Sequence, residues 1–123
     1  MNWLAVFIGG GLGSVLRYGL SILLKDKFTS WPAGTILSNV LATGLLALFV
    51  WMLGAKMIQN QSTLGLFLMV GLCGGFSTFS TFSLETFGLI RNGLVGLAML
   101  NIAISIGLCL LVLFILLRKS SFV

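Results

Sequence analysis

Residues 71–85, GLCGGFSTFSTFSLE, set hydroxyl side chains between phenylalanines that repeat every three residues. This stretch lies inside an apolar run from Leu64 to Ile90, and polar groups inside such a run are functional candidates because lipid does not solvate them. A helix of that length would measure about 40 Å against a bilayer core of ~30 Å. The glycine pair at 74–75 therefore predicts that the third span is broken near its middle. A continuous, tilted helix is the alternative.

The rest of the chain is as apolar as this stretch. Of its 123 residues 59% are hydrophobic and only 7% are charged, whereas a soluble domain carries roughly 25% charged residues. Three further runs, 2–24, 33–53 and 94–117, are long enough to cross a bilayer, and the connections between the four runs are short and polar. We expect one domain, 1–123: an all-α integral membrane protein with four transmembrane helices. The first run lacks the features of a cleavable signal and is expected to stay attached.

The cations are scattered singly or in pairs, which disfavours a nucleic-acid partner. Four spans put both termini on one face of the membrane, so the flanking Lys and Arg residues can be counted on each side. The two faces tie at three each: Lys56, Arg118 and Lys119 against Lys25, Lys27 and Arg91. Either one loop sets the orientation weakly, or oppositely inserted copies pair as a dual-topology dimer.

Small residues spaced four apart allow helix backbones to approach closely. They serve packing within one chain or an interface between subunits, and the sequence leaves both open. The pairs are Gly9/Gly13, Gly10/Ser14, Gly34/Ser38, Gly71/Gly75 and Ala103/Gly107. The cysteines, Cys73 and Cys109, lie in apolar runs and are expected to be free, buried thiols.

The intramembrane polar side chains each have two interpretations. The hydroxyls at 77, 78, 80, 81 and 83 either bond back to their own helix or line an anion path, which the positive ring edges of the neighbouring phenylalanines would also suit. Arg17 either snorkels to an interface or attracts an anion, and Asn39 either joins helices or faces a pore. Glu85 is expected near an interface. Asn101 and Ser105, one turn apart, form either a polar track or packing contacts.

Three motifs, in order along the chain, resemble the Fluc (CrcB) family of fluoride channels. The resemblance covers nearly the whole chain, with one departure: Asn101 stands where family members commonly carry Tyr. The motifs are Gly9-Gly10-x-x-Gly13-Ser14-x-x-Arg17-Tyr18, Gly34-Thr35-x-x-x-Asn39 and Gly74-Gly75-x-Ser77-Thr78-Phe79-Ser80-Thr81-Phe82.

This resemblance implies a passive, fluoride-selective channel, and not an enzyme, that exports fluoride from a prokaryotic cell through its plasma (inner) membrane. It implies an antiparallel dual-topology homodimer, or a pair with an oppositely oriented paralogue, with two narrow pores. The backbone carbonyls of Gly74 and Ser77 would hold a structural sodium ion at the dimer centre. The implied fluoride pathway comprises Phe79, Phe82, Asn39, Ser80, Thr81, Arg17, Thr35, Ser105 and Glu85.

Two other functional classes of membrane protein are compatible with this apolar composition. A small multidrug-resistance-like, proton-coupled exporter also has four spans, but its mechanism needs a buried carboxylate in the first span, where this chain carries Arg17 and no acid. A membrane subunit that only packs helices is the second alternative. It predicts that Phe79→Ile, Phe82→Ile and Asn39→Ala leave any transport unchanged.

Overall fold

The computed structural model describes residues 1–25, 31–54, 56, 60 and 62–118, and within these ranges the chain is helical without a strand. Four helical segments are long and apolar enough to cross a membrane, as the sequence predicts: α1 (Asn2–Lys25), α2 (Ala33–Leu53), a third span over Thr63–Arg91, and α7 (Val95–Leu117). The third span is composite. It contains α4 (Thr63–Gly65), the π-helical η1 (Leu66–Cys73), α5 (Gly74–Phe76) and α6 (Phe79–Arg91).

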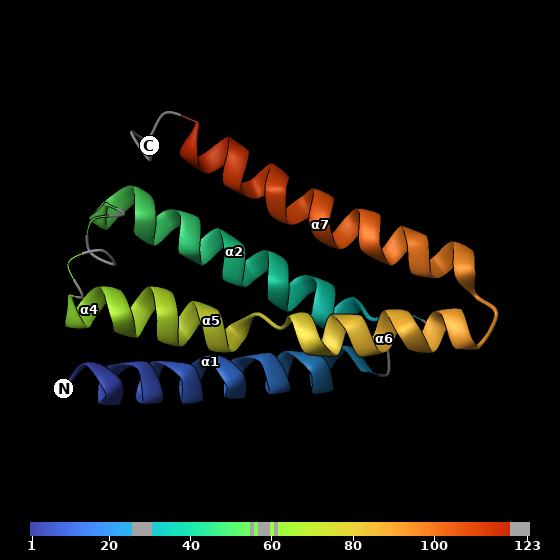
Figure 1. Cartoon of the computed structure of the whole chain (residues 1–123), viewed down its shortest axis with the longest axis horizontal. Helices are drawn as coiled ribbons and strands as arrows, with labels where there is room; N and C mark the ends of the chain where they lie inside the picture. The colour runs from blue at the N-terminus through green and yellow to red at the C-terminus, as the bar shows by residue number, and fades with distance from the viewer. Residues whose placement is uncertain (26–30, 55, 57–59, 61, 119–123) are drawn as a thin grey trace.

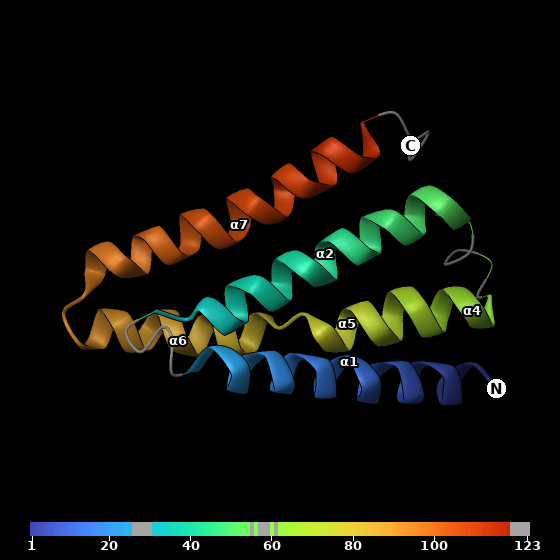
Figure 2. The same ribbon diagram turned by 180° about the vertical axis from the view of Figure 1, so that it is seen from behind.

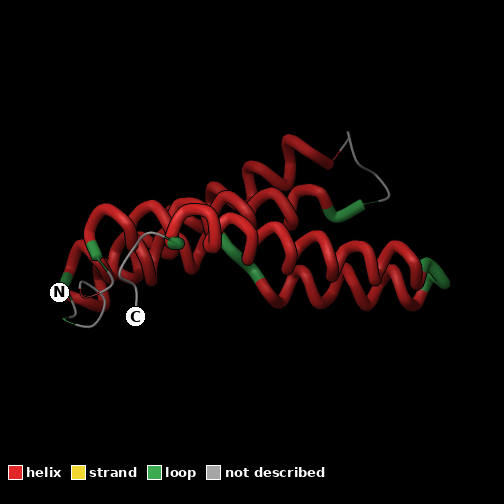
Figure 3. Tube along the Cα trace, turned by 90° about the horizontal axis from the view of Figure 1, so that it is seen from above, coloured by secondary structure: helices red, strands yellow, loops and turns green. Residues whose placement is uncertain are grey.

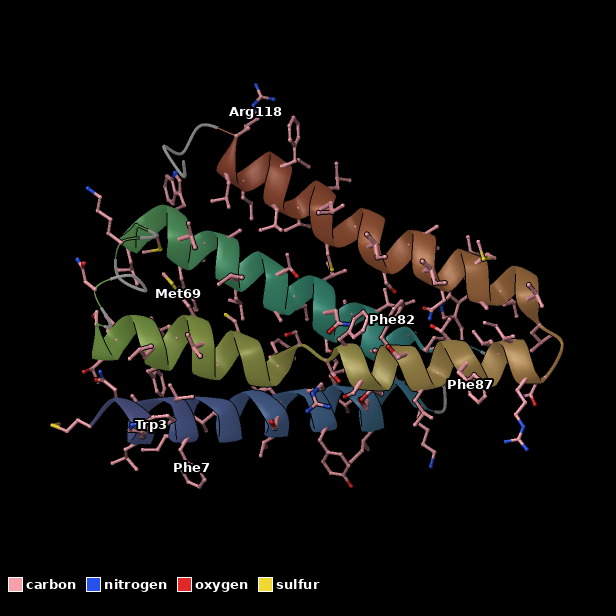
Figure 4. The ribbon with its side chains drawn as sticks, viewed as in Figure 1. Trp3, Phe7, Met69, Phe82, Phe87 and Arg118 are labelled. Atoms are coloured by element: carbon pink, nitrogen blue, oxygen red, sulfur yellow. The ribbon has the colours of Figure 1, made fainter. Side chains whose placement is uncertain are left out.

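The helices form a fan (Figure 1). α1 lies along the first half of the third span, α2 packs against α1 and η1, and α7 packs against α2 and α6 while diverging from α1. Seen from behind, the fan opens toward the end that holds both termini (Figure 2). Trp3 and Phe7 point outward from α1, away from the other helices (Figure 4), as expected for side chains that lipid solvates.

Glycines set the distance between α1 and the third span. A Cβ atom at Gly13 would collide with the backbone of Leu72 and Phe76, and one at Gly75 would collide with the carbonyl of Gly10. Small residues at a helix contact permit such approach, which strengthens dispersion contacts in lipid. The glycine pairs of these two spans therefore serve packing within the chain.

The third span bends at Ser77 and Thr78 (Figure 3). Both residues have extended backbones, with φ, ψ of −80°, 159° and −154°, 121°. Gly74 and Gly75 were expected to be the point of interruption, but both are helical, and Gly75 faces α1. The polar residues after the glycines bend instead, because the Thr78 side chain caps α6 by accepting a hydrogen bond from the backbone N–H of Thr81 at 3.2 Å.

The flanking charges are balanced in the described part of the chain. Lys56 and Arg118 belong to the end of the fan that carries the termini, and Lys25 and Arg91 to the opposite end. Lys27 and Lys119, which complete the predicted tie, lie outside the described residues.

Candidate functional site

A cavity of about 290 Å³ lies between α2, the bend, α6 and α7. We call it the aromatic cavity. No charged side chain lines it, so its polar groups are one amide, hydroxyls and the backbone at the bend. Its lining residues are Asn39, Thr43, Ser77, Thr78, Phe79, Phe82, Ser105, Ile106, Cys109 and Leu110.

Two phenylalanines from the first turn of α6 give this cavity its aromatic wall. The ring centroids of Phe79 and Phe82 are 5.7 Å apart and the ring planes are inclined by 41°. Phe82 is only 8% exposed, whereas Phe79 is 78% exposed. Figure 4 shows Phe82 on the side of α6 that faces α2 and α7, and Phe87 on the opposite side. Both rings line the cavity, and their edges carry the positive part of the aromatic quadrupole.

Asn39 of α2 forms hydrogen bonds with the backbone polar groups of Thr78 at the bend. Its Nδ2 donates to the Thr78 carbonyl at 3.1 Å, and its Oδ1 accepts from the Thr78 N–H at 2.7 Å. As the N-cap of α6, Thr78 can use its carbonyl in the first turn of that helix, but its extended backbone leaves its N–H without a helical acceptor, and an unpaired backbone group at membrane depth is costly. Asn39 thus holds the bend in place, and one of its two amide hydrogens remains for the cavity it lines.

Arg17 occupies the other side of the bend. Its Nε donates to the Gly75 carbonyl at 3.1 Å, and this carbonyl lies in the last turn before the bend, where no helical N–H follows at the usual spacing. A cation at the C-terminal end of a helix also interacts favourably with the helix dipole. The structure therefore places Arg17 against a helix end, and its role in an anion vestibule stays a prediction.

The hydroxyls of the 71–85 stretch divide into two groups. The Ser77 and Ser83 hydroxyls bond back to the carbonyls of Gly74 and Phe79, at 3.4 Å and 2.9 Å. The others surround the cap of α6: Thr78 donates to the Thr81 hydroxyl at 3.1 Å, and its Oγ1 lies 3.3 Å from that of Ser80. A connected group of hydroxyls therefore lies at the start of α6, beside Phe79.

Glu85 and Thr35 meet in a second cavity of about 290 Å³, toward the end of the fan where α1 finishes at Lys25. The Thr35 hydroxyl donates to Glu85 Oε1 at 2.8 Å. Oε2 of Glu85 and Nε1 of Trp31, which also line this cavity, are buried without a hydrogen-bond partner in the described part of the chain. This second cavity does not share lining residues with the aromatic cavity.

A chain of hydrogen bonds joins α7 to α6 behind the aromatic cavity. Ser105 donates to Asn101 Oδ1 at 3.4 Å, Asn101 Nδ2 donates to Thr86 Oγ1 at 2.9 Å, and Thr86 donates to the Phe82 carbonyl at 2.7 Å. Asn101 is 1% exposed. Packing contacts and a polar track were alternatives for Asn101 and Ser105. Asn101 makes the packing contact, while Ser105 also reaches the cavity wall.

The aromatic cavity thus unites Phe79, Phe82, Asn39 and Ser105, whereas Thr35 and Glu85 line the second cavity. Sequence reasoning missed Thr86, because a lone hydroxyl in an amphipathic helix gives no signal of its partner. It also missed the cap at Thr78, although a threonine just before a periodic apolar run is a recognised helix-start signal. Both cysteines are free; Cys73 is buried as expected, but Cys109 is partly exposed because it lines the cavity wall.

Comparison with known proteins assigns the chain to a family. Residues 4–116 match the family described as CrcB-like protein, Camphor Resistance (CrcB). A protein of Methylobacterium radiotolerans named fluoride-specific ion channel FluC is 44% identical over 107 residues, covering 86% of this chain and 75% of the relative. Proteins of the same name from Pyrococcus furiosus and Ruminiclostridium cellulolyticum are 50% and 40% identical, with 79% and 89% of this chain and 77% and 85% of the relatives covered. With matches of this extent and four spans, the chain is a multi-pass membrane protein that belongs to the CrcB-like family.

Proposed function

We propose that this protein is a fluoride-selective ion channel and not an enzyme. Its relatives carry the name fluoride-specific ion channel. The observation that carries the proposal is the aromatic cavity, which offers neutral donors and ring edges and no charged side chain. Fluoride is small and strongly hydrated, so a conducting site must replace its water with several weak donors and still release it.

Each expected pathway residue has a part in this proposal. The edges of Phe79 and Phe82, the free amide hydrogen of Asn39 and the Ser105 hydroxyl would contact the ion in the aromatic cavity. The remaining expected residues would serve the approaches. Ser80 and Thr81 add hydroxyls at the start of α6, Thr35 and Glu85 line the second cavity, and Arg17 adds a positive field beside the bend.

The conducting form is an antiparallel, dual-topology dimer, of two identical copies or of this chain with an oppositely oriented paralogue. Support comes from the exposed side of the third span near its middle, where Phe79, Ser80 and Ser83 are uncovered in a single copy. Polar side chains exposed at that depth are poorly solvated by lipid, which favours a protein surface or a water-filled cavity against them. The balanced charges at the two ends of the fan allow insertion in both orientations.

A sodium ion at the dimer centre fits the backbone of the bend. In the described part of the chain no backbone N–H donates to the carbonyl of Gly74 or Ser77, because the Thr78 N–H is taken by Asn39 and the Thr81 N–H by the cap. The Gly74 carbonyl accepts a long hydrogen bond of 3.4 Å from the Ser77 hydroxyl, and carbonyl oxygens of this kind are suitable ligands for a hard cation. Sodium would supply positive charge that holds the two bends together.

Residence in the plasma (inner) membrane of a prokaryote follows from the family resemblance. There the channel would release fluoride that enters the cell as its neutral acid. The membrane potential, negative inside, would drive the anion outward, giving fluoride resistance without coupling to another substrate. A proton-coupled exporter fits less well, because α1 carries Arg17 and no carboxylate.

The test is fluoride efflux from liposomes that hold purified wild-type protein or one of three variants, read with a fluoride electrode. Phe79→Ile and Phe82→Ile are expected to lose most of the flux because the ring edges disappear, whereas the control Phe87→Ile, 59% exposed on the opposite side of α6, keeps it. Equal flux in all four proteins would contradict a path along these rings and would favour a subunit that only packs helices.

A further inference from the structure

Ser105 differs from four other hydroxyl residues inside helices in how its proton is used. Ser21, Thr43, Ser83 and Thr86 each donate to the backbone carbonyl four residues earlier, at 2.7–2.9 Å. Such back-bonding is the usual arrangement and leaves the hydroxyl little freedom to bind anything else. Ser105 donates instead to the side chain four residues earlier, Asn101 Oδ1, at the longer distance of 3.4 Å.

The orientation of the Asn101 amide is fixed by its second contact. Thr86 uses its only hydroxyl proton on the Phe82 carbonyl, so Thr86 Oγ1 can only accept from Asn101. The amide must therefore turn its Nδ2 toward Thr86 and its Oδ1 toward Ser105. Since Asn101 is 1% exposed, no water competes for this arrangement.

We propose that Asn101 is a positioning residue that diverts the Ser105 hydroxyl from its helix backbone and holds it, weakly bonded, at the wall of the aromatic cavity. This inference rests on the proposed function, in which Ser105 donates to the permeating anion. A hydroxyl held at 3.4 Å exchanges its acceptor easily, whereas one bonded to its backbone at 2.7–2.9 Å does not. The residue at position 101 thereby determines whether Ser105 is available to the ion.

The test is a double-mutant cycle with Asn101→Leu, which keeps a branched side chain of similar size but cannot accept a proton, and Ser105→Ala. Each single variant is expected to lower fluoride efflux roughly three- to tenfold, the range that one neutral hydrogen bond supports. The double variant should be no slower than the slower single variant, because Asn101 acts through Ser105.

Thr86→Val is a second test, because it removes the acceptor that fixes the orientation of the Asn101 amide. This substitution should lower the fluoride flux when it is made in the wild-type protein, but should not lower it further when it is made in the Ser105→Ala variant. Met99→Leu, exposed on α7, is the control that keeps wild-type flux.

Multiplicative losses of flux in the double variant would overturn the proposal, since Asn101 would then act independently of Ser105. The unfolding equilibrium constants of the same four proteins are also measured in detergent. If Asn101 positions Ser105, the effects of the two substitutions on this constant should depend on each other by a factor of at least about three. Independent effects there would also overturn it. If wild-type protein conducts no fluoride, the proposed function fails, while the unfolding cycle still decides whether Asn101 holds Ser105.

Discussion

Replacing Asn39 tests whether the bend depends on a single side chain. In Asn39→Leu the Thr78 N–H loses its acceptor and no helical carbonyl replaces it because the backbone there is extended, whereas the Thr78 carbonyl, at the N-cap of α6, keeps the first turn of that helix as a partner. Each orphaned buried group costs about 1–3 kcal/mol. The free energy of unfolding should therefore fall by about 1–3 kcal/mol, with little contribution from packing because the side chains are similar in size.

The assay is reversible unfolding of the reconstituted protein in mixed detergent micelles, followed by circular dichroism. Thr43→Val is the matched control on the same helix. It removes one hydroxyl that bonds only to the Asn39 carbonyl, so it should change the free energy of unfolding by less than about 1 kcal/mol. A loss in Asn39→Leu no larger than in Thr43→Val would refute the reasoning, because the bend would then not need Asn39.

Three further perturbations test other parts of the account. Gly13→Ala places a Cβ atom against the backbone of Leu72 and Phe76 and should lower the free energy of unfolding by about 1–3 kcal/mol. Gly11→Ala, which has open space around it, is the control and should be neutral. Equal thermal unfolding midpoints for these two variants would contradict close packing of α1. Thr35→Val deprives Glu85 Oε1 of its donor and should destabilise the wild-type protein more than a Glu85→Leu variant, which has no acceptor for the Thr35 hydroxyl. Identical losses in the two backgrounds, measured by unfolding titrations, would rule out this contact as the cause. Replacing sodium by choline should shift the purified protein from dimer toward monomer in light scattering, and an unchanged dimer fraction would count against a central sodium ion.

The four spans could be predicted from the sequence because hydropathy and length alone decide what crosses a bilayer. The position of the bend could not. Gly74 and Gly75 suggested flexibility, but their lack of side chains serves the contact with α1, and the interruption follows where Thr78 finds a partner in Asn39, 39 residues away. A contact between distant residues leaves no periodic pattern.

The same limit applies to the candidate site. Phe79, Phe82 and Asn39 could be singled out from residue type and motif, and the structure brings them to one cavity. The partner of Asn101 was not predictable, since an amide in an apolar helix is compatible with any neighbouring hydroxyl. The separation of Glu85 and Thr35 from the aromatic cavity depends on how α2 crosses α6, which only the packed structure shows.

The most direct test of the central claim is anion efflux from liposomes that contain only this protein, with a potassium ionophore added to balance charge. A fluoride channel should lose fluoride rapidly once the ionophore is added, with no loss of chloride from matched vesicles. Chloride efflux at a similar rate, or no fluoride efflux from folded protein even after co-reconstitution with an oppositely oriented paralogue, would contradict this claim.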